Sequence, residues 1–446
     1  MKENTKLIIS IFCIAFIVRF LFLLIMPQFF DGMFGFRDDW IYLTYAKNII
    51  SQGIWVPDVT KMDLEIFGKP YNAHVVGPGW PLIISLIILL FGENIQLIMF
   101  INVILSSLTC IVIYYLGKEV FNKKIGIISS FWSIIYIYFL IYIPRILKES
   151  ILQLLIPLVI LLMVYEIKKV KLNMVTILFP LTFTFLIHTD ERYLIFLPII
   201  FIGLMACDNI NMKNGLKKFA VFMTSVIVLS IPWTIRNYVV YNKIVVLTVR
   251  TERVINPILK KINNYNIIHN INGEIGKDLS KEYPDNERYE VFDRRLLSYS
   301  ENGDYPLTFL DAVNEVFQRF KIYWAPMVLR ESIYRGVTMS AGSLKYNFGG
   351  MFSFGIILPF FIIGSFICFK KNRLGTIMIF FILIQTILHV LPLQTLIMWP
   401  RYRYPIDSLI ITIAFYGLYQ LMHANLIKRQ VSNIKSLFSI LYGSRI

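Results

Sequence analysis

The stretch LIISIFCIAFIVRFLFLLIM, residues 7–26, decides the fold, because it is an apolar run of the length that a membrane helix needs. A helix requires about 20 predominantly apolar residues to cross roughly 30 Å of hydrocarbon. Comparable runs follow at 352–369 and 376–391. Hydrophobic residues make up 57% of the chain and charged residues only 16%, which excludes an ordinary soluble domain. The chain is therefore predicted to be an all-α integral membrane protein.

The apolar runs predict about ten transmembrane helices. We expect them at 7–27, 96–116, 125–142, 149–166, 172–187, 191–206, 218–233, 350–368, 375–392 and 405–422. The first run lacks a small-residue cleavage site, so we interpret it as a retained signal-anchor. The four cysteines lie inside or beside apolar runs, which argues against a disulfide framework: Cys13, Cys110, Cys207 and Cys368.

The charge pattern predicts the orientation. The formal charge of +16 is scattered in short clusters and forms no single basic face, so nucleic acid is not expected as a partner. Lysine-rich, acid-poor connections are typical of cytoplasmic loops. They occur at 118–124, 168–171, 213–218, 370–373 and 428–429. A multi-pass protein of the cell membrane with both termini cytoplasmic satisfies this pattern.

One apolar segment breaks the alternation. GPGWPLIISLIILLFG, residues 77–92, is short and opens with glycines and prolines. If it crossed the bilayer, every later basic loop would face outward, so we predict a re-entrant or interfacial helix. A misassigned short span elsewhere is the alternative. The resulting organisation is an N-terminal transmembrane module (1–233) with a first outer loop at 28–95, an extracytoplasmic loop or cap (234–349), and C-terminal helices with a cytoplasmic tail (350–446).

Two adjacent carboxylates, Asp38 and Asp39, follow the first span in the stretch GFRDDWIYLTYAKNIISQGIW, residues 35–55. A carboxylate at the membrane surface can take a proton from an acceptor hydroxyl during attack, so both are catalytic candidates. An N-cap is the alternative interpretation, since Asp before a helix accepts from free backbone N–H groups. One cap needs one side chain, so this alternative suits Asp39 better than Asp38.

Two arginines, Arg401 and Arg403, lie at the predicted outer mouth of the last span, against the positive-inside tendency. The planar guanidinium suits phosphate, and we assign Arg401, Arg403 and Tyr402 as candidates for binding a lipid-linked phosphate. The alternative is that the arginines extend to lipid headgroups, with the tyrosines as interfacial belt residues.

Charged residues at other outer ends are additional candidates: His74, Glu149, Asp190, Arg192 and Arg236. Charges so close to hydrocarbon are costly unless they are paired or used. Local ion pairs, Lys148 with Glu149 or Glu191 with Arg192, are the simpler interpretation of two short turns. Arg236 beside Trp233 can likewise be an ordinary flanking cation.

No cofactor is assigned from the sequence. Three histidines, His74, His188 and His389, are expected toward the outer half, where nearby carboxylates leave room for a divalent metal. No close ligand spacing such as His-x-x-x-His occurs, so no metal ligand is named. A Walker loop, a Rossmann fingerprint and a GxSxG elbow are also absent from the sequence, which argues against nucleotide-driven chemistry.

These pieces, in this order, resemble the GT-C membrane glycosyltransferases, in particular the family 39 group of protein mannosyltransferases and aminoarabinose transferase-like enzymes. DDWIY (38–42) with YAKNIISQG (45–53) resembles the family's Asp-Glu-x-x-Tyr, Ala-containing helix and Gly. YNAHVVGPGWPLIISLIILLFG (71–92) resembles its Pro-Pro-Leu helix ending in Phe-Gly. IPWTIRNYVVYNK (231–243) and PRYRYPI (400–406) complete the pattern, whereas the remainder of the loop 234–349 matches no motif.

The resemblance implies transfer of a sugar from a polyprenyl-phosphate donor on the extracytoplasmic face, by inverting displacement with an Asp base. Asp38 matches that Asp, and Asp39 replaces the usual Glu. Glu149 matches a further outer carboxylate only loosely. Arg401 and Arg403 match basic residues near the donor phosphate. The acceptor, whether protein, lipid or polysaccharide, is not indicated.

A different class remains open at this stage. A transporter or flippase for a lipid or lipid-linked sugar would also use arginines and carboxylates at the membrane. Such proteins commonly carry interrupted helices in both halves, whereas here only the N-terminal half has one. A non-catalytic scaffold subunit would need neither Asp38 nor Arg403.

Overall fold

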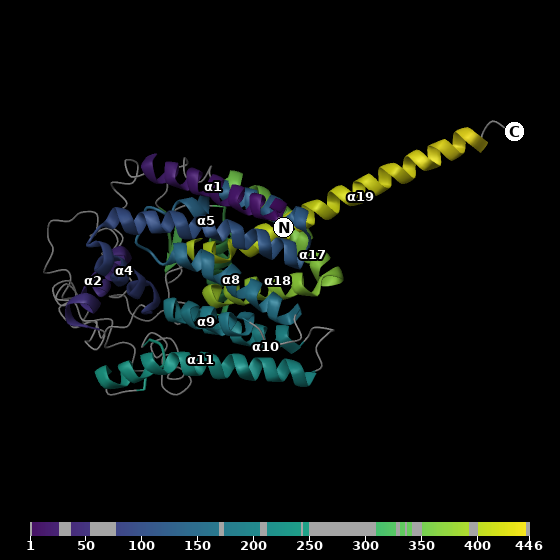
Figure 1. Ribbon diagram of the computed structural model, residues 1–446. Coiled ribbons are helices and arrows are strands. Elements are labelled where there is room, and N and C mark those ends of the chain that lie inside the picture. Colours follow the sequence, from purple (N-terminus) through teal and green to yellow (C-terminus); the bar gives the residue numbers. More distant parts are fainter. Residues whose placement is uncertain are drawn as a thin grey trace.

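The computed structural model describes residues 2–25, 37–53, 77–168, 174–205, 212–241, 244–248, 309–326, 331–334, 337–340, 350–391 and 400–442. Helices dominate these ranges, and one two-stranded antiparallel sheet accompanies them. The transmembrane helices pack as a bundle, which Figure 1 shows from the side. The all-α membrane architecture predicted from the sequence is thus confirmed.

Helices occupy every predicted span. They are α1 (Lys2–Ile25), α5 (Ile95–Val120), α6 (Lys123–Ile135) with α7 (Ile137–Leu140), α8 (Glu149–Lys168), α9 (Met174–Thr189), η2 (Glu191–Phe196) with α10 (Leu197–Met205), α11 (Met212–Tyr241), η3 (Met351–Gly355) with α17 (Ile356–Lys371), α18 (Arg373–Val390), and η5 (Tyr404–Ile406) with α19 (Asp407–Tyr442). Among the described residues, seven helices are long and apolar enough to cross a membrane. The spans predicted at 125–142, 172–187 and 191–206 are shorter or broken helices.

The break between α6 and α7 has an identifiable support. Tyr136 is extended there (φ −69°, ψ 115°), so the last carbonyls of α6 have no helical partners. The buried guanidinium of Arg19 donates to the carbonyl oxygens of Ser133 (3.0 Å) and Ile134 (3.2 Å). Irregular backbone in a membrane is tolerated where protein satisfies its polar groups, and Arg19 does so here. The break lets residues 137–148 turn toward one end of the bundle.

The segment with the Gly-Pro motif forms α4 (Gly79–Phe91), whose 13 residues are too few to cross a bilayer. It packs beside α2 (Arg37–Gln52) at one end of the bundle (Figure 1). A β-carbon at Gly77 would lie 2.1 Å from the His188 carbonyl oxygen, and one at Gly79 would lie 2.3 Å from Thr189 Oγ1. The two glycines therefore permit close contact between the start of α4 and the end of α9.

The bundle has two distinct ends. In Figure 1 the N-terminal end of α1 and the far end of α19 both point to the right, whereas α2 and α4 lie at the left. Both termini therefore leave the same side, which agrees with the predicted even number of crossings between them. Which side faces the cytoplasm stays a prediction.

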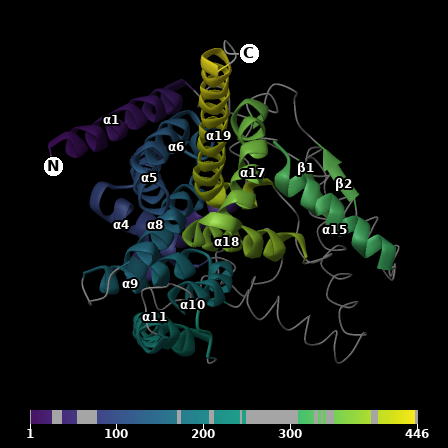
Figure 2. The ribbon, with the colours of Figure 1, turned by 90° about the vertical axis from the view of Figure 1, so that its right-hand side faces the viewer.

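The predicted cap, 234–349, is described only in part. α11 continues past the predicted boundary to Tyr241, and its end binds residues 244–248: Trp233 Nε1 donates to the Leu247 carbonyl (3.0 Å) and Asn237 Nδ2 to the Val245 carbonyl (2.8 Å). α15 (Phe309–Trp324) packs against α18 and against β1. Figure 2 shows α15 beside the strands, running across the view. The division into three domains stays a prediction.

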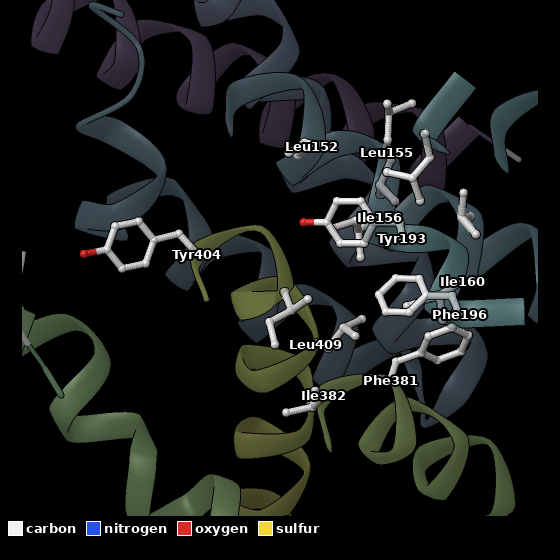
Figure 3. Close-up of a cluster of buried hydrophobic side chains, with 14 of the residues drawn as sticks. Leu152, Leu155, Ile156, Ile160, Tyr193, Phe196, Phe381, Ile382, Tyr404 and Leu409 are labelled. Carbon is white, nitrogen blue, oxygen red and sulfur yellow. The ribbon is translucent and has the colours of Figure 1, made fainter. Parts of the chain in front are cut away.

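The strands β1 (Glu331–Tyr334) and β2 (Val337–Ser340) form a short hairpin, with Glu331 opposite Ser340. A tightly packed apolar cluster lies at the centre of the bundle, where α8, η2, α18 and α19 meet (Figure 3). The rings of Phe196 and Phe381 meet edge-to-face there, with centroids 4.7 Å apart. Because lipid is as apolar as these side chains, close packing rather than water exclusion holds such helices together. The cluster fixes η2 relative to α18, and so it positions Arg192 on η2 and His389 on α18 relative to each other.

Candidate active site

Ends of several elements meet at the α2/α4 end of the bundle and carry most of the buried charge there. These elements are the start of α2, the turn 141–148, the turn between α9 and η2, the last turn of α18, and η4 (Pro400–Tyr402). The side chains that link them are Asp39, Arg145, Lys148, Glu149, Asp190, Arg192, His389, Arg401 and Tyr402. We call this set the polar cluster.

Asp39 joins α2 to the turn before α8. Its Oδ1 accepts from the backbone N–H of Ile146 at 2.8 Å, and its Oδ2 lies 3.5 Å from Arg145 Nη1. α2 begins at Arg37, so Asp39 lies within the first helical turn and its carboxylate contacts another element. Its observed role is therefore a tertiary anchor, in addition to any effect on the helix terminus. The backbone of Asp38 belongs to the same turn, and its side chain lies outside the described part of the chain.

Asp190 is the most deeply buried carboxylate of the polar cluster. Its Oδ2 lies 2.8 Å from Lys148 Nζ, its Oδ1 accepts from Arg192 Nε at 2.8 Å, and its side chain is 0% exposed. Burial alone would raise the pKa of Asp190, but Arg192 and Lys148 outweigh it and hold that pKa well below its ordinary value. Asp190 therefore stays ionised, and its oxygen also caps η2 through the Arg192 N–H.

The local ion pairs considered from sequence are not the ones that form. Among the described residues, Lys148 pairs with Asp190 and not with its neighbour Glu149, and Arg192 pairs with Asp190 and not with Glu191. Glu149 instead faces Arg401, across 3.8 Å between Oε1 and Nε. The reason is geometric, because at the first turns of α8 and η2 these side chains point toward other elements.

Tyr402 connects two of the cations. The guanidinium of Arg192 lies 5.0 Å from the centre of its ring and that of Arg401 lies 5.6 Å away, both within cation–π range. His389 also stacks on this ring, with ring centroids 4.8 Å apart. Tyr402 is thus a shared platform that holds both arginines near one point.

Arg403, by contrast, is directed into the protein. It is 0% exposed, its Nε donates to Asp407 at 3.0 Å, and its Nη1 donates to the carbonyls of Tyr323 (2.9 Å) and Ala325 (3.0 Å). Asp407 also accepts from the Tyr136 hydroxyl at 2.8 Å. Arg403 therefore ties α15 to the start of α19.

The remaining candidates have different surroundings. His74 lies outside the described residues. Arg236 is buried with its guanidinium 4.8 Å from the Trp233 ring, and its Nη1 donates to Asn237, at the end of α11 that binds 244–248. No group of three or more His, Cys, Asp or Glu that could hold a metal occurs within the described ranges. The histidines singled out from sequence therefore gain no metal site there.

Sequence reasoning missed Lys148, His389 and Asp407 as contributors. Lys148 and Asp190 are far apart in the chain, and no local pattern connects them. His389 was noted from sequence only as an outer-half histidine near which a divalent metal could bind. Asp407 did carry a signal, since its i, i+4 spacing from Arg403 favours an ion pair on a helix.

Comparisons with known proteins can now be set beside this geometry. Residues 75–235 match the sequence model of a family described as dolichyl-phosphate-mannose-protein mannosyltransferase. The matched region includes α4 and the turns that carry Lys148 and Asp190. Among curated protein sequences, none matches this chain.

Two solved structures have similar folds. One is the archaeal oligosaccharyltransferase AglB from Archaeoglobus fulgidus in complex with an inhibitory peptide and a dolichol-phosphate, with a TM-score of 0.59 and 14% identity over 97% of this chain and 52% of that one. The other is ArnT from Cupriavidus metallidurans bound to undecaprenyl phosphate, with a TM-score of 0.52 and 13% identity over 98% of this chain and 65% of that one.

The fold is that of the GT-C membrane glycosyltransferases, the class to which both solved proteins belong. The resemblance noted in the sequence is thereby confirmed, with the mannosyltransferase match over residues 75–235 in addition. The chain spans about half the length of the oligosaccharyltransferase that it resembles.

Proposed function

We propose that this protein is a membrane glycosyltransferase that moves a sugar from a polyprenyl-phosphate donor to an acceptor on the extracytoplasmic face. The observation that carries the proposal is the convergence of three cations, Lys148, Arg192 and Arg401, at one end of a GT-C fold. The two similar proteins were solved with a dolichol-phosphate and with undecaprenyl phosphate, so a phosphate-bearing polyprenyl lipid fits this end by analogy.

Arg401 is the better donor-phosphate ligand of the two arginines predicted from sequence. Its side chain is 19% exposed, and its Nε lies at the long distance of 3.8 Å from Glu149 Oε1. An incoming phosphate can replace so weak a partner and form charge-assisted hydrogen bonds with the guanidinium. Arg403 is fully enclosed and already bound to Asp407, so we assign it the support of the segment that carries Arg401.

We assign Asp38 as the general base. The carboxylate of Asp39 already faces the Ile146 N–H and Arg145, which leaves its neighbour as the carboxylate for chemistry on α2. In the proposed step an acceptor oxygen forms a bond to the anomeric carbon while the bond from that carbon to the phosphate oxygen breaks. Polyprenyl phosphate leaves with the electron pair, and the acceptor proton passes to Asp38. A single displacement of this kind inverts the anomeric configuration.

The test uses the full-length protein in lipid nanodiscs with a panel of polyprenyl-phosphate sugars. We expect one of them to lose its sugar and release polyprenyl phosphate, and Asp38→Asn to stop that release. Arg401→Ala should raise the apparent KM for the donor. If no member of the panel is bound or turned over by the wild-type protein, the proposed function is wrong. If Asp38→Asn turns over normally, only the assignment of the base is wrong.

A further inference from the structure

His389 is enclosed by polar and aromatic groups at the end of α18. It is 3% exposed, its Nδ1 lies 2.9 Å from the Gln385 carbonyl oxygen, and its Nε2 lies 3.1 Å from Arg192 Nη1. One face of its ring stacks on Tyr402 at 4.8 Å, and the ring of Tyr323 from α15 lies 6.0 Å away. His389 thus contacts both Arg192 and Tyr402, the ring that lies near Arg192 and Arg401.

The chemistry of the partners determines which ring nitrogen carries the proton. A backbone carbonyl only accepts hydrogen bonds, so Nδ1 must donate to Gln385. A guanidinium only donates, so Nε2 must be unprotonated to accept from Arg192. The ring is therefore the neutral, Nδ1-protonated tautomer.

We propose that His389 is a positioning residue for the donor-phosphate site, acting through Arg192. This inference rests on the proposed function. The acceptor lone pair on Nε2 fixes one Nη of Arg192, while Asp190 binds its Nε. A guanidinium anchored on both sides keeps one orientation beside the Tyr402 ring, whose centre lies 5.0 Å from its central carbon. Asp190 binds the guanidinium at Nε and Nη2, so without the imidazole Arg192 would keep Asp190 but lose the contact that holds its Nη1.

Two substitutions separate the two roles of the ring. His389→Gln retains an amide oxygen near the position of Nε2 and so keeps an acceptor for Arg192, while it removes the stacked ring. His389→Phe retains a ring for Tyr402 and removes the acceptor. Losing a hydrogen bond to a charged group weakens an interaction by roughly ten- to a hundredfold. If orientation of Arg192 is what matters, the Gln variant should be the better binder.

A matched control is available in the same chain. His423 on α19 makes the same kind of contact to the carbonyl four residues earlier, with Nδ1 2.9 Å from the Tyr419 oxygen, and its ring also lies on a tyrosine. Among the contacts of the described residues, His423 has no arginine partner. His423→Phe should therefore leave binding of undecaprenyl phosphate unchanged.

The first measurement needs no ligand. The chain has five histidines, so ¹⁵N-histidine labelling yields few ring signals, and the pair lost in His389→Gln belongs to His389. We expect that pair to report a neutral ring protonated at Nδ1. A ring protonated at Nε2, or at both nitrogens, at neutral pH would overturn the inference whatever the protein does.

The second measurement is binding of undecaprenyl phosphate to the full chain in nanodiscs. We expect His389→Phe to weaken binding about ten- to a hundredfold and His389→Gln to stay within about threefold of wild type. Equal loss in both variants, or no loss in the Phe variant, overturns the positioning role. Failure of the wild-type protein to bind the lipid would instead overturn the proposed function, while the tautomer result would stand by itself.

Discussion

Replacing Asp190 with asparagine removes the single negative charge that the buried Lys148 and the partly buried Arg192 share. Lys148 Nζ and Arg192 Nε each lie 2.8 Å from its oxygens, and none of its surface is exposed. Removing one partner of a buried ion pair costs about 3–5 kcal/mol, because the remaining charge loses its compensation. Here two charges lose it, so we expect Asp190→Asn to fall in the upper part of that range. Donor binding should weaken as well, since Arg192 loses one of its two anchors.

The assay is thermal unfolding of purified protein in nanodiscs, followed by intrinsic fluorescence. Asp39→Asn is the matched comparison, because the carboxylate of Asp39 lies at the longer distance of 3.5 Å from Arg145 Nη1. We expect a clearly larger loss of stability for Asp190→Asn than for Asp39→Asn. The double variant Asp190→Asn/Lys148→Met removes one of the uncompensated cations, so it should recover part of the loss.

The pH dependence has a defined sign. The pKa of Asp190 is held well below its ordinary value, with burial opposed and outweighed by Arg192 and Lys148. A depressed pKa contributes stability above the unfolded-state pKa of about 3.9, and this stability is lost only as pH falls through the folded value. The contribution of Asp190 to stability should therefore be fully present and independent of pH between pH 5 and 8. Wild-type stability in Asp190→Asn, or a loss that the double variant does not partly recover, would refute the reasoning that Asp190 compensates both cations.

Three further outcomes are expected. Arg401→Ala should raise the apparent KM for the donor roughly ten- to a hundredfold with normal insertion, as expected for the loss of a charge-assisted contact. Arg403→Ala should instead lower stability, because Asp407 is left buried without its arginine partner. Donor titration with parallel unfolding curves distinguishes the two variants. Asp38→Asn should reduce turnover by about 10²–10⁴-fold while donor binding stays near wild type, and single-turnover sugar release measures this. A cysteine introduced at Ser280 in a cysteine-free background should react with an impermeant reagent on intact cells, and labelling only after lysis would reverse the proposed orientation.

Part of the site could be predicted because some residues violate local rules. Arginines at an outer membrane boundary and adjacent carboxylates after the first span are costly or unusual at those positions, so single-residue reasoning singles them out. The same reasoning could not separate Arg401 from Arg403, which differ by two positions in one short stretch. Their separation depends on the 3₁₀ turns of η4 and η5, which direct one side chain to the polar cluster and the other to Asp407.

The all-α membrane fold and the presence of a helix at each of the ten predicted positions followed from the sequence alone, because partition of an apolar run into a bilayer depends on its own length and composition. The short α4 was also foreseen, since glycine and proline at its start are local signals. Only the tertiary structure decided the partners of Lys148, Asp190 and His389. Ion pairs and ring stacks form wherever the ends of packed helices meet, and packing distances between α8, η2 and α18 are not written in any local pattern. For that reason the site that binds the donor in our proposal had to be seen as a cluster, and not as a motif.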